Sequence, residues 1–303
     1  MFLSPRLESD ELKVYRYLEA RMELNSKEKQ QYINLTKGLE GELQFDRLLE
    51  QLGERFLILS DLLLEKQNTF FQIDSLLISH DTIFLFEVKN YEGDYYIEDD
   101  KWFSCAGSEI QNPLIQLKRS ESLLRRFLQS YQLSYQIKAF LIFINPEFTL
   151  YQAPLNKTII FHSQLKRFMN ELSLRKVPIR EKHMQLAQKI LSEHQEKSPY
   201  ARLPIYQYGQ LQKGIGCVGC SSIETRSDAA SLVCERCGSV ENIDSALIRN
   251  AEEFTILFPD KKLTTNAVHE WSGEIVSKKT IRRVLRKNYI LIGHGRTSHF
   301  IKK

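Results

Sequence analysis

Three observations predict an α/β body followed by two smaller modules. Helix-like and strand-like patterns alternate between residues 37 and 165. Four of the five cysteines form two Cys-x-x-Cys pairs. Residues 260–303 hold eleven basic and three acidic side chains, whereas the whole chain of 303 residues has a net charge of only +4. At about 100–200 residues for each domain, this length predicts roughly two domains.

The composition is that of a globular chain. Hydrophobic residues make up 42% and charged residues 26%, which excludes collagen, a coiled-coil rod and a wholly disordered chain. The first residues, MFLSPRLESDELK, include acids where a signal peptide needs an apolar run, and no stretch approaches the ~18 apolar residues of a membrane helix. We therefore expect a cytoplasmic protein with no membrane partner.

Shifts in composition divide the chain into five expected segments. In order, these are an N-terminal helical segment, the α/β body, a helical segment with a linker, a cysteine module and a basic tail. Their expected bounds are 1–36, 37–165, 166–211, 212–241 and 242–303. One or two amphipathic helices are expected in the first segment from the spacing of Leu12, Tyr15, Leu18 and Met22.

Two runs of β-forming residues, 68–79 and 82–89, predict an antiparallel hairpin. If the turn is symmetric about the two residues between the runs, opposed residue numbers sum to 161, and Asp74 lies across from Glu87 on the same face. Opposed like charges in an apolar run are destabilising, so a counter-charge is needed. A divalent cation would supply it.

Other polar side chains are expected on the inward faces of the same body. Lys89 shares the face of Glu87, because residues two apart on a strand point the same way. Gly38 opens an expected helix whose apolar stripe also carries Glu42. Further along, Asn112 and Pro113 begin a second helix, with Gln116 on its inner stripe.

Each of these residues also has a purely structural interpretation. Glu42 suits the first turn of a helix, Asp74 and Glu87 could pair with lysines, and Gln116 could be a surface amide. Their joint occurrence on inward-facing positions favours a functional site.

In this order the motifs resemble the nuclease-related domain (NERD) family, similar to a branch of the PD-(D/E)xK nuclease superfamily. The residues that carry the resemblance are Gly41-Glu42, Ile73-Asp74, Ile78-Ser79, Phe86-Glu87-Val88-Lys89-Asn90-Tyr91, Gly93, Trp102 and Asn112-Pro113-x-x-Gln116. The resemblance covers residues 37–162 and implies a restriction-endonuclease-like mixed sheet flanked by helices. One departure is Ser75, where many members carry a histidine.

The resemblance further implies a metal-dependent nuclease that hydrolyses DNA phosphodiester bonds. Lys89 would orient or activate the attacking water and stabilise charge on the phosphate, and Gln116 would position water or the backbone phosphate. The implied ligands of catalytic Mg²⁺ (or Mn²⁺) are Asp74, Glu87, the Val88 carbonyl and, directly or through water, Glu42.

Two other functions are left open. One is a non-catalytic DNA-binding or regulatory protein built on a nuclease fold. The other is an RNA-processing enzyme, since the metal chemistry suits either nucleic acid. The joint presence of Glu42, Asp74, Glu87 and Lys89 favours catalysis, because a binding module has no need for clustered inward carboxylates.

The paired cysteines have the spacing of a Cys₄ zinc ribbon. Thirteen residues separate Cys217-x-x-Cys220 from Cys234-x-x-Cys237. A module of ~25 residues cannot bury a core, so structural Zn²⁺ would supply most of its folding free energy. A redox pair is the competing interpretation. Cys105 stands alone and is expected to be a packed thiol.

The basic tail has the pattern of a winged-helix-like domain. Residues 263–271, capped by Thr264 or Thr265, and 278–289, capped by Ser277, predict a helix-turn-helix. A helix near 243–253 would be the third, and strands 289–292 and 297–301 would form the wing.

Basic side chains on the second helix and in the wing are expected to contact nucleic acid. They are Lys278, Lys279, Arg282, Arg283, Arg286, Lys287 and Arg296. The alternative is a small helical domain with a solvated basic face.

Overall fold

A computed structural model describes residues 1–174, 178–195 and 199–303, except for the side chain of Arg296. Contacts between residues divide the chain into two units, each made of two pieces. Unit 1 comprises Met1–Glu8 and Asn34–Tyr200, and unit 2 comprises Ser9–Ile33 and Ala201–Lys303. The border after Ile33 lies inside helix α2 (Ser26–Glu50).

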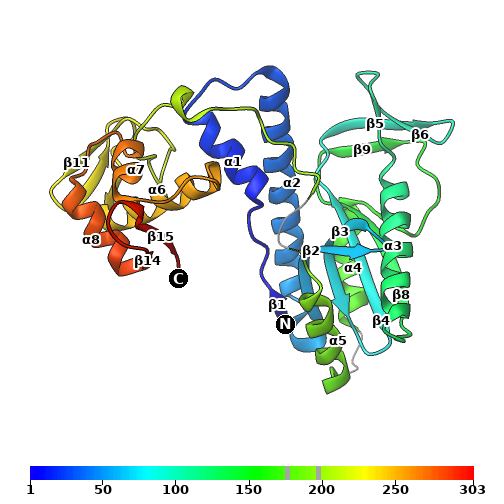
Figure 1. Ribbon diagram of the computed structural model, residues 1–303. Helices are drawn as coiled ribbons and strands as arrows, with labels where there is room; N and C mark the ends of the chain where they lie inside the picture. The colour runs from blue at the N-terminus through cyan, green and yellow to red at the C-terminus, as the bar shows by residue number, and fades with distance from the viewer. Residues whose placement is uncertain (175–177, 196–198) are drawn as a thin grey trace. The chain divides into compact units, whose positions relative to one another are not determined.

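Unit 1 is built on a mixed six-stranded sheet (Figure 1). Its central strands β2, β3 and β4 are antiparallel neighbours, whereas β1, β8 and β10 each join the sheet in parallel. In spatial order the strands are β1 (Phe2–Ser4), β2 (Leu57–Lys66), β3 (Thr69–Ile78), β4 (Thr82–Lys89), β8 (Gln136–Phe143) and β10 (Ile159–Ile160).

A smaller four-stranded sheet and three further helices complete unit 1. The small sheet has the order β7 (Glu109–Ile110), β6 (Lys101–Ser104), β5 (Gly93–Glu98) and β9 (Phe148–Tyr151). The helices are α3 (Pro113–Ser130), α4 (His162–Ser173) and α5 (Glu181–Ser192), with a 3₁₀ turn at Gly53–Arg55. The expected segment boundary between residues 165 and 166 falls inside α4.

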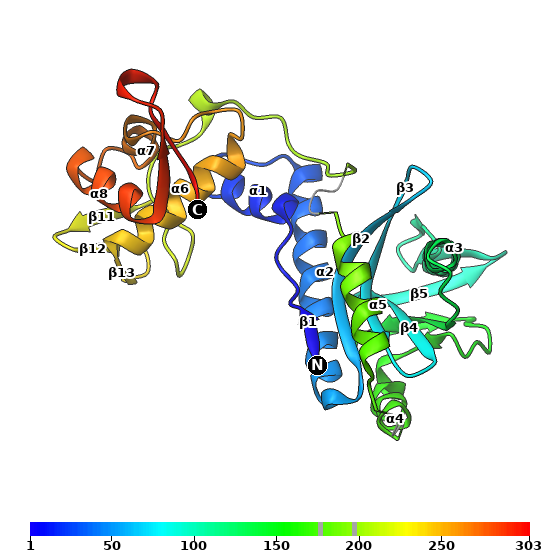
Figure 2. The same ribbon diagram turned by 60° about the horizontal axis from the view of Figure 1, so that its bottom comes forward.

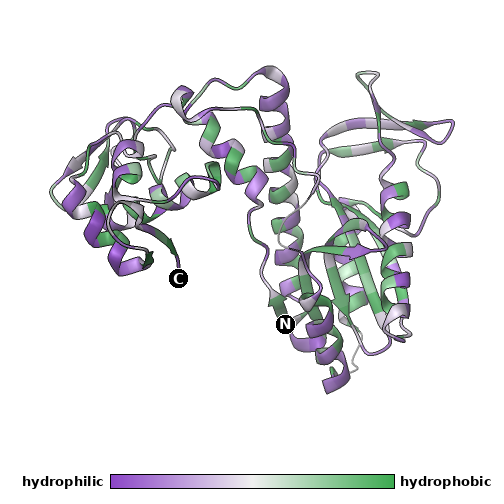
Figure 3. Cartoon of the chain, in the orientation of Figure 1, coloured by the Kyte–Doolittle hydropathy of each residue, from purple (hydrophilic) through white to green (hydrophobic). Residues whose placement is uncertain are grey.

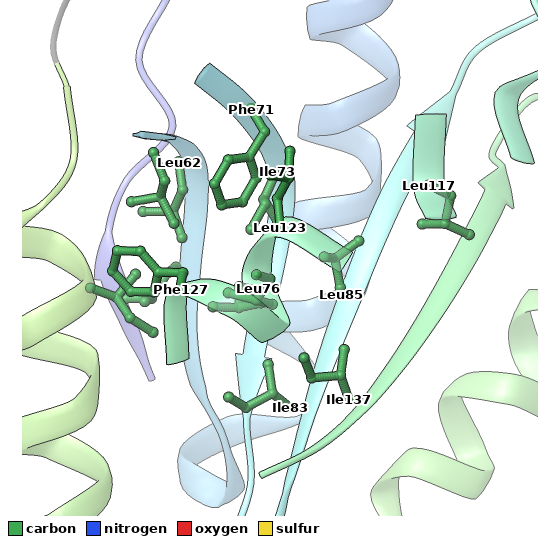
Figure 4. Close-up of a cluster of buried hydrophobic side chains, with 14 of the residues drawn as sticks. Leu62, Phe71, Ile73, Leu76, Ile83, Leu85, Leu117, Leu123, Phe127 and Ile137 are labelled. Carbon is green, nitrogen blue, oxygen red and sulfur yellow. The ribbon is translucent and has the colours of Figure 1, made fainter. Parts of the chain in front are cut away.

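Helices cover both faces of the large sheet, with α2 and α3 on opposite sides (Figures 1 and 2). One core joins the sheet to α3 and α5, and contains Leu76, Leu85 and Leu123 (Figure 4). The other core joins it to α2 and α4, and contains Phe45 and Phe86. Apolar residues dominate the central strands (Figure 3), as expected for strands that are buried on both faces.

Helix α2 begins well before the predicted start at Gly38, at Ser26. Asn25 and Glu28 form a capping box: Asn25 Oδ1 accepts from the Glu28 amide at 3.0 Å, and Glu28 Oε2 accepts from the Asn25 amide at 2.9 Å. Gly41 is a packing position, since a Cβ there would lie 2.6 Å from the Cβ of Asn90. The glycines therefore lie in the middle of the helix and do not mark its start.

Unit 2 contains the remaining helices and two small sheets. The helices are α1 (Asp10–Glu19), α6 (Ile243–Leu257), α7 (Thr265–Trp271) and α8 (Lys278–Asn288), with 3₁₀ turns at Tyr208–Gln210 and Gly295–Thr297. The strands are β11 (Thr225–Asp228), β12 (Ser231–Cys234), β13 (Val240–Asn242), β14 (Tyr289–Ile292) and β15 (His299–Lys302). None of the described helices is long and apolar enough to cross a membrane.

A buried ion pair joins the two pieces of unit 2. Arg21 donates from Nε to Glu253 at 2.6 Å and from its terminal nitrogens to the carbonyls of Gln212 and Gly214. Because α1 also contacts α6, the amphipathic helix expected near the N-terminus packs inside this unit.

Candidate functional site

The register of the β3–β4 hairpin is the one predicted from the sequence. Ser75 pairs with Phe86 and Ile78 with Ile83, so paired residue numbers sum to 161. One step further, this register sets Asp74 opposite Glu87. Asp74 is 6% exposed and Glu87 2% exposed, so two carboxylates are buried on adjacent strands.

Lys89 and Gln116 lie next to this pair. Lys89 Nζ lies 2.7 Å from Glu87 Oε1 and 3.2 Å from Gln116 Oε1. Helix α3 places Gln116 near its start, where the Asn112 side chain caps the helix by accepting from the Leu114 amide at 2.9 Å. The structure therefore brings one ammonium, one amide and two carboxylates together beside the start of α3.

Burial and like charge shift the pKa of both carboxylates upward. Desolvation, followed by the charge of Asp74, raises the pKa of Glu87 to about 7. Desolvation also raises the pKa of Asp74, against the opposing effects of Lys89 and of the Val88 amide, which donates to Asp74 Oδ2 at 2.7 Å. Burial works against the charge of Lys89, but Glu87 and Asp74 hold the pKa of Lys89 above its usual range.

Glu42, on helix α2, is in an ion pair with Arg6. Arg6 Nη1 donates to Glu42 Oε2 at 2.6 Å, and its Nε donates to Asp46 Oδ2 at 2.8 Å. Desolvation, followed by the charge of Asp74, raises the pKa of Glu42 to about 8 although Arg6 opposes this. Asp74 and Glu42 therefore interact through their charges, while Glu42 makes its direct contact with Arg6.

Sequence reasoning missed three charged residues near this site. Arg6 comes from the segment after β1, Asp46 lies one helical turn beyond Glu42, and Asp61 lies opposite Asp74 in the β2–β3 register. The spacing of Glu42 and Asp46 along α2 is a signal for Asp46. The sequence around Arg6 or Asp61 gives no sign that either residue lies near the site, because both reach it only through the pairing of strands.

Asp74 and Glu87, beside Lys89, fit a hard divalent cation by their chemistry. No described residue donates a hydrogen bond to Asp74 Oδ1 or Glu87 Oε2, so each carboxylate keeps an oxygen for a ligand. The pKa values of Asp74 and Glu87 are both raised, and a nearby cation would lower them by favouring the ionised carboxylates. Among the described residues, the four paired cysteines form a group of three or more converging metal-ligating side chains, whereas Glu42, Asp74 and Glu87 do not form such a group.

The four paired cysteines converge as a metal-binding group in unit 2. Their sulfur atoms all lie within 4.8 Å of one another. Two separations are 3.6 Å (Cys217–Cys237) and 3.7 Å (Cys220–Cys234), which is too long for a disulfide. Tetrahedral zinc with Zn–S bonds of about 2.3 Å requires sulfur separations of about 3.8 Å. Cys105 is exposed in a turn, so the prediction of a packed thiol is wrong.

Five of the seven basic side chains predicted to bind nucleic acid are exposed on α8 without an ion pair to any described residue. The exception on this helix is Arg283, whose Nη1 and Nη2 donate to Asp244 at 2.8 and 2.5 Å. The side chain of Arg296 lies outside the described part of the chain. The helix caps are as predicted, since Thr264 accepts from the Ala267 amide and Ser277 from the Thr280 amide.

Unit 1 thus has a mixed sheet flanked by helices, with two buried carboxylates beside a lysine. Residues 37–144 match the family model described as "Nuclease-related domain" (NERD). The match confirms the family resemblance expected from the sequence, and the mixed sheet flanked by helices confirms the expected fold class.

Two solved structures show weak similarity to the chain. One is the small subunit of the heterodimeric restriction endonuclease R.BspD6I, with 13% identity and a TM-score of 0.25 over 60% of this chain and 87% of that one. The other is protein VC1899 from Vibrio cholerae, with 11% identity and a TM-score of 0.26 over 51% and 39%. A search of curated proteins found no match.

Proposed function

We propose that the chain is a metal-dependent nuclease that hydrolyses DNA phosphodiester bonds. The observation that carries this proposal is the cluster of Asp74, Glu87, Lys89 and Gln116 within the nuclease-related domain. Asp74 and Glu87, with the Val88 carbonyl, would hold Mg²⁺ or Mn²⁺, and Glu42 would complete the site directly or through water. A bound metal ion would polarise the scissile phosphate and lower the pKa of a bound water.

The chain's own residues define the rest of the reaction. Because its pKa is held above the usual range, Lys89 is an ammonium at neutral pH. It therefore stabilises the negative charge that develops on the phosphate and orients the attacking water. As an ammonium, it does not accept a proton from that water. Gln116 fixes the Lys89 ammonium through its Oε1, which leaves its amide NH₂ available to water or a phosphate oxygen.

The test is cleavage of supercoiled plasmid and single-stranded DNA by metal-free protein, with and without Mg²⁺ or Mn²⁺. Asp74→Asn, Glu87→Gln and Lys89→Met should each lower the cleavage rate at least 100-fold without changing the circular dichroism spectrum. The matched control is Asp99→Asn, because Asp99 is exposed in a turn with a φ of 48° that asparagine tolerates.

Three outcomes separate the candidate functions. Metal-dependent cutting that the three variants lose supports the nuclease. DNA binding without cutting by the wild type favours the non-catalytic regulatory protein. Cutting of RNA in preference to DNA, measured with matched oligonucleotides, favours the RNA-processing enzyme.

Unit 2 would supply nucleic-acid affinity through the basic face of α8 in a winged-helix-like arrangement, with the cysteine module as a structural zinc ribbon. The triple variant Arg282→Gln/Arg286→Gln/Lys287→Gln should weaken DNA binding and lower the slope of log K against log salt by up to about 3, at ~0.9 for each phosphate that is no longer neutralised. Arg283→Gln is the control, since Asp244 already neutralises Arg283. An unchanged slope in the triple variant contradicts this role for α8.

A further inference from the structure

Asp74 lies at an interruption in the pairing of strand β3. Among the described strands, β2 pairs with β3 on either side of this residue, at Ile73 and Ser75, but not at Asp74 itself. Pairing between β3 and β4 ends at Ser75 and does not reach Asp74. The residue opposite on β2, Asp61, has a φ of 52°, which a regular strand does not contain. Strand pairing therefore does not hold the backbone at Asp74.

Arg6 supplies a hydrogen bond at this interruption. Its Nη2 donates to the Asp74 carbonyl at 2.6 Å and to Ser75 Oγ at 3.1 Å. At the other end of the same residue, the Val88 amide donates to Asp74 Oδ2 at 2.7 Å. A guanidinium thus holds the backbone of Asp74, while an amide of β4 holds its carboxylate.

The guanidinium of Arg6 is itself fixed in place. The Arg6 side chain is only 1% exposed, and it also donates to Glu42 at 2.6 Å and to the two oxygens of Asp46 at 2.8 and 3.2 Å. Because a guanidinium is planar and its donors have fixed directions, these two carboxylates of α2 set where Nη2 points. Arg6 therefore links α2 to the backbone of a proposed metal ligand.

Arg6 reaches Asp74 from the edge of the sheet. Strand β1 runs parallel to β2, and Ser4 Oγ accepts from the Ser60 amide at 3.2 Å. Arg6 follows two residues after Ser4 and precedes residues 37–144, which match the family model. The segment before the matched domain thus contributes a contact to the candidate site.

We propose that Arg6 is a positioning residue for the metal site formed by Asp74 and Glu87. It holds Asp74 where strand pairing does not, and so keeps the Asp74 carboxylate beside Glu87. This inference rests on the proposed function, because it takes both acids as metal ligands. Replacing a residue that orients a metal ligand typically changes metal affinity roughly 10–100-fold.

Hydrogen exchange of the zinc-replete full chain, freed of other metals, tests the positioning directly. Because the Val88 amide bonds to Asp74 Oδ2, its exchange rate reports where that carboxylate lies. Arg6→Met removes the donors but keeps a long side chain, and Arg6→Lys keeps the charge without the planar set of donors. Exchange at Val88 should be about 10-fold faster in both variants, while Ile83 and Leu85 inside β4 stay protected.

Arg21→Met is the matched control for these variants. Arg21 is also a buried, ion-paired arginine, but it lies in unit 2, so its loss should leave exchange at Val88 unchanged. Wild-type exchange at Val88 in both Arg6 variants would overturn the inference. Uniform loss of protection throughout β3 and β4 in both variants would also overturn it, because Arg6 would then only stabilise the fold.

Calorimetric titration with Mn²⁺ alone measures the consequence for the metal site. Both Arg6 variants should bind Mn²⁺ roughly 10–100-fold more weakly than the wild type, whereas Arg21→Met should match the wild type. Wild-type affinity in the Arg6 variants contradicts the inference. A wild type that binds no Mn²⁺ contradicts the proposed metal-dependent nuclease, and exchange at Val88 then still decides whether Arg6 positions Asp74.

Discussion

Glu87 is a buried acid and Glu42 a half-buried one, and the ionisation of both opposes folding. Burial raises the pKa of Glu87 to about 7 and that of Glu42 to about 8, above the usual value of 4.5. Between about pH 4.5 and 8 the folded state therefore binds more protons than the unfolded chain. The resulting stability is fully present below the unfolded pKa and is lost as the pH rises through 7 and 8.

The metal-free protein should accordingly lose stability between pH 5 and pH 9. Glu87→Gln should lose less, because one pKa unit corresponds to about 1.4 kcal/mol and the glutamine does not ionise. Urea unfolding at each pH measures this, with Glu65→Gln as the control at an exposed position. Mg²⁺ should restore part of the loss, because it binds the ionised carboxylates. A larger loss in Glu87→Gln than in the wild type would contradict the assignment.

The site was predictable where it depends on local order along the chain. Asp74, Glu87 and Lys89 follow from one hairpin register, and Gln116 from one cap and its helical spacing. Arg6 was not predictable, because it reaches the site only after β1 pairs with β2, more than fifty residues further along the chain. Its own neighbours in the sequence give no sign of that partner.

Helices with a clear capping residue in the sequence were also predictable. A helix whose sequence is shaped by tertiary packing was harder to predict. The caps at Thr264 and Ser277 fix where α7 and α8 begin. The start of α2 was wrong although Asn25 and Glu28 form a readable capping box, because glycines usually interrupt helices. At position 41 the close approach of Asn90 leaves no room for a Cβ, so the position requires glycine. This contact forms only in the tertiary structure and has no local signal in the sequence.

The two glycines inside α2 provide a matched test of this explanation. Gly41→Ala should destabilise the protein by about 1–3 kcal/mol, since its Cβ would lie 2.6 Å from the Cβ of Asn90 and 3.1 Å from Ile144. Gly38→Ala should stabilise it by about 0.5–1 kcal/mol, because nothing lies within 4 Å and alanine favours a helix. Chemical denaturation of both variants measures these changes. Equal effects would contradict the packing role of Gly41.

At the scale of the whole molecule, unit 2 is stabilised by contacts far apart in the sequence and, as proposed, by a metal ion. The cysteine module has a three-stranded sheet and few buried apolar residues, among them Leu232. Such a module cannot fold on its hydrophobic core alone, whereas structural zinc contributes ~10–16 kcal/mol in small peptides.

Native mass spectrometry should find one zinc ion per chain. Cys220→Ser should lose the ion and expose the amides of β11–β13 to rapid hydrogen exchange, because three thiolates and a hydroxyl bind zinc less tightly. Cys105→Ser should retain both the ion and the protection, since Cys105 lies in unit 1. Less than half an equivalent of zinc in the native protein would contradict a zinc ribbon.

The ion pair between Arg21 and Glu253 also sets an order of events during synthesis. Its partners are 232 residues apart, so at about 5–20 residues per second a ribosome needs roughly 10–50 s to make the second after the first. During that interval the apolar face of α1, which includes Leu12 and Leu18, has no α6 to cover it. The nascent chain therefore presents an early apolar segment that chaperones can bind until the last third of the protein emerges.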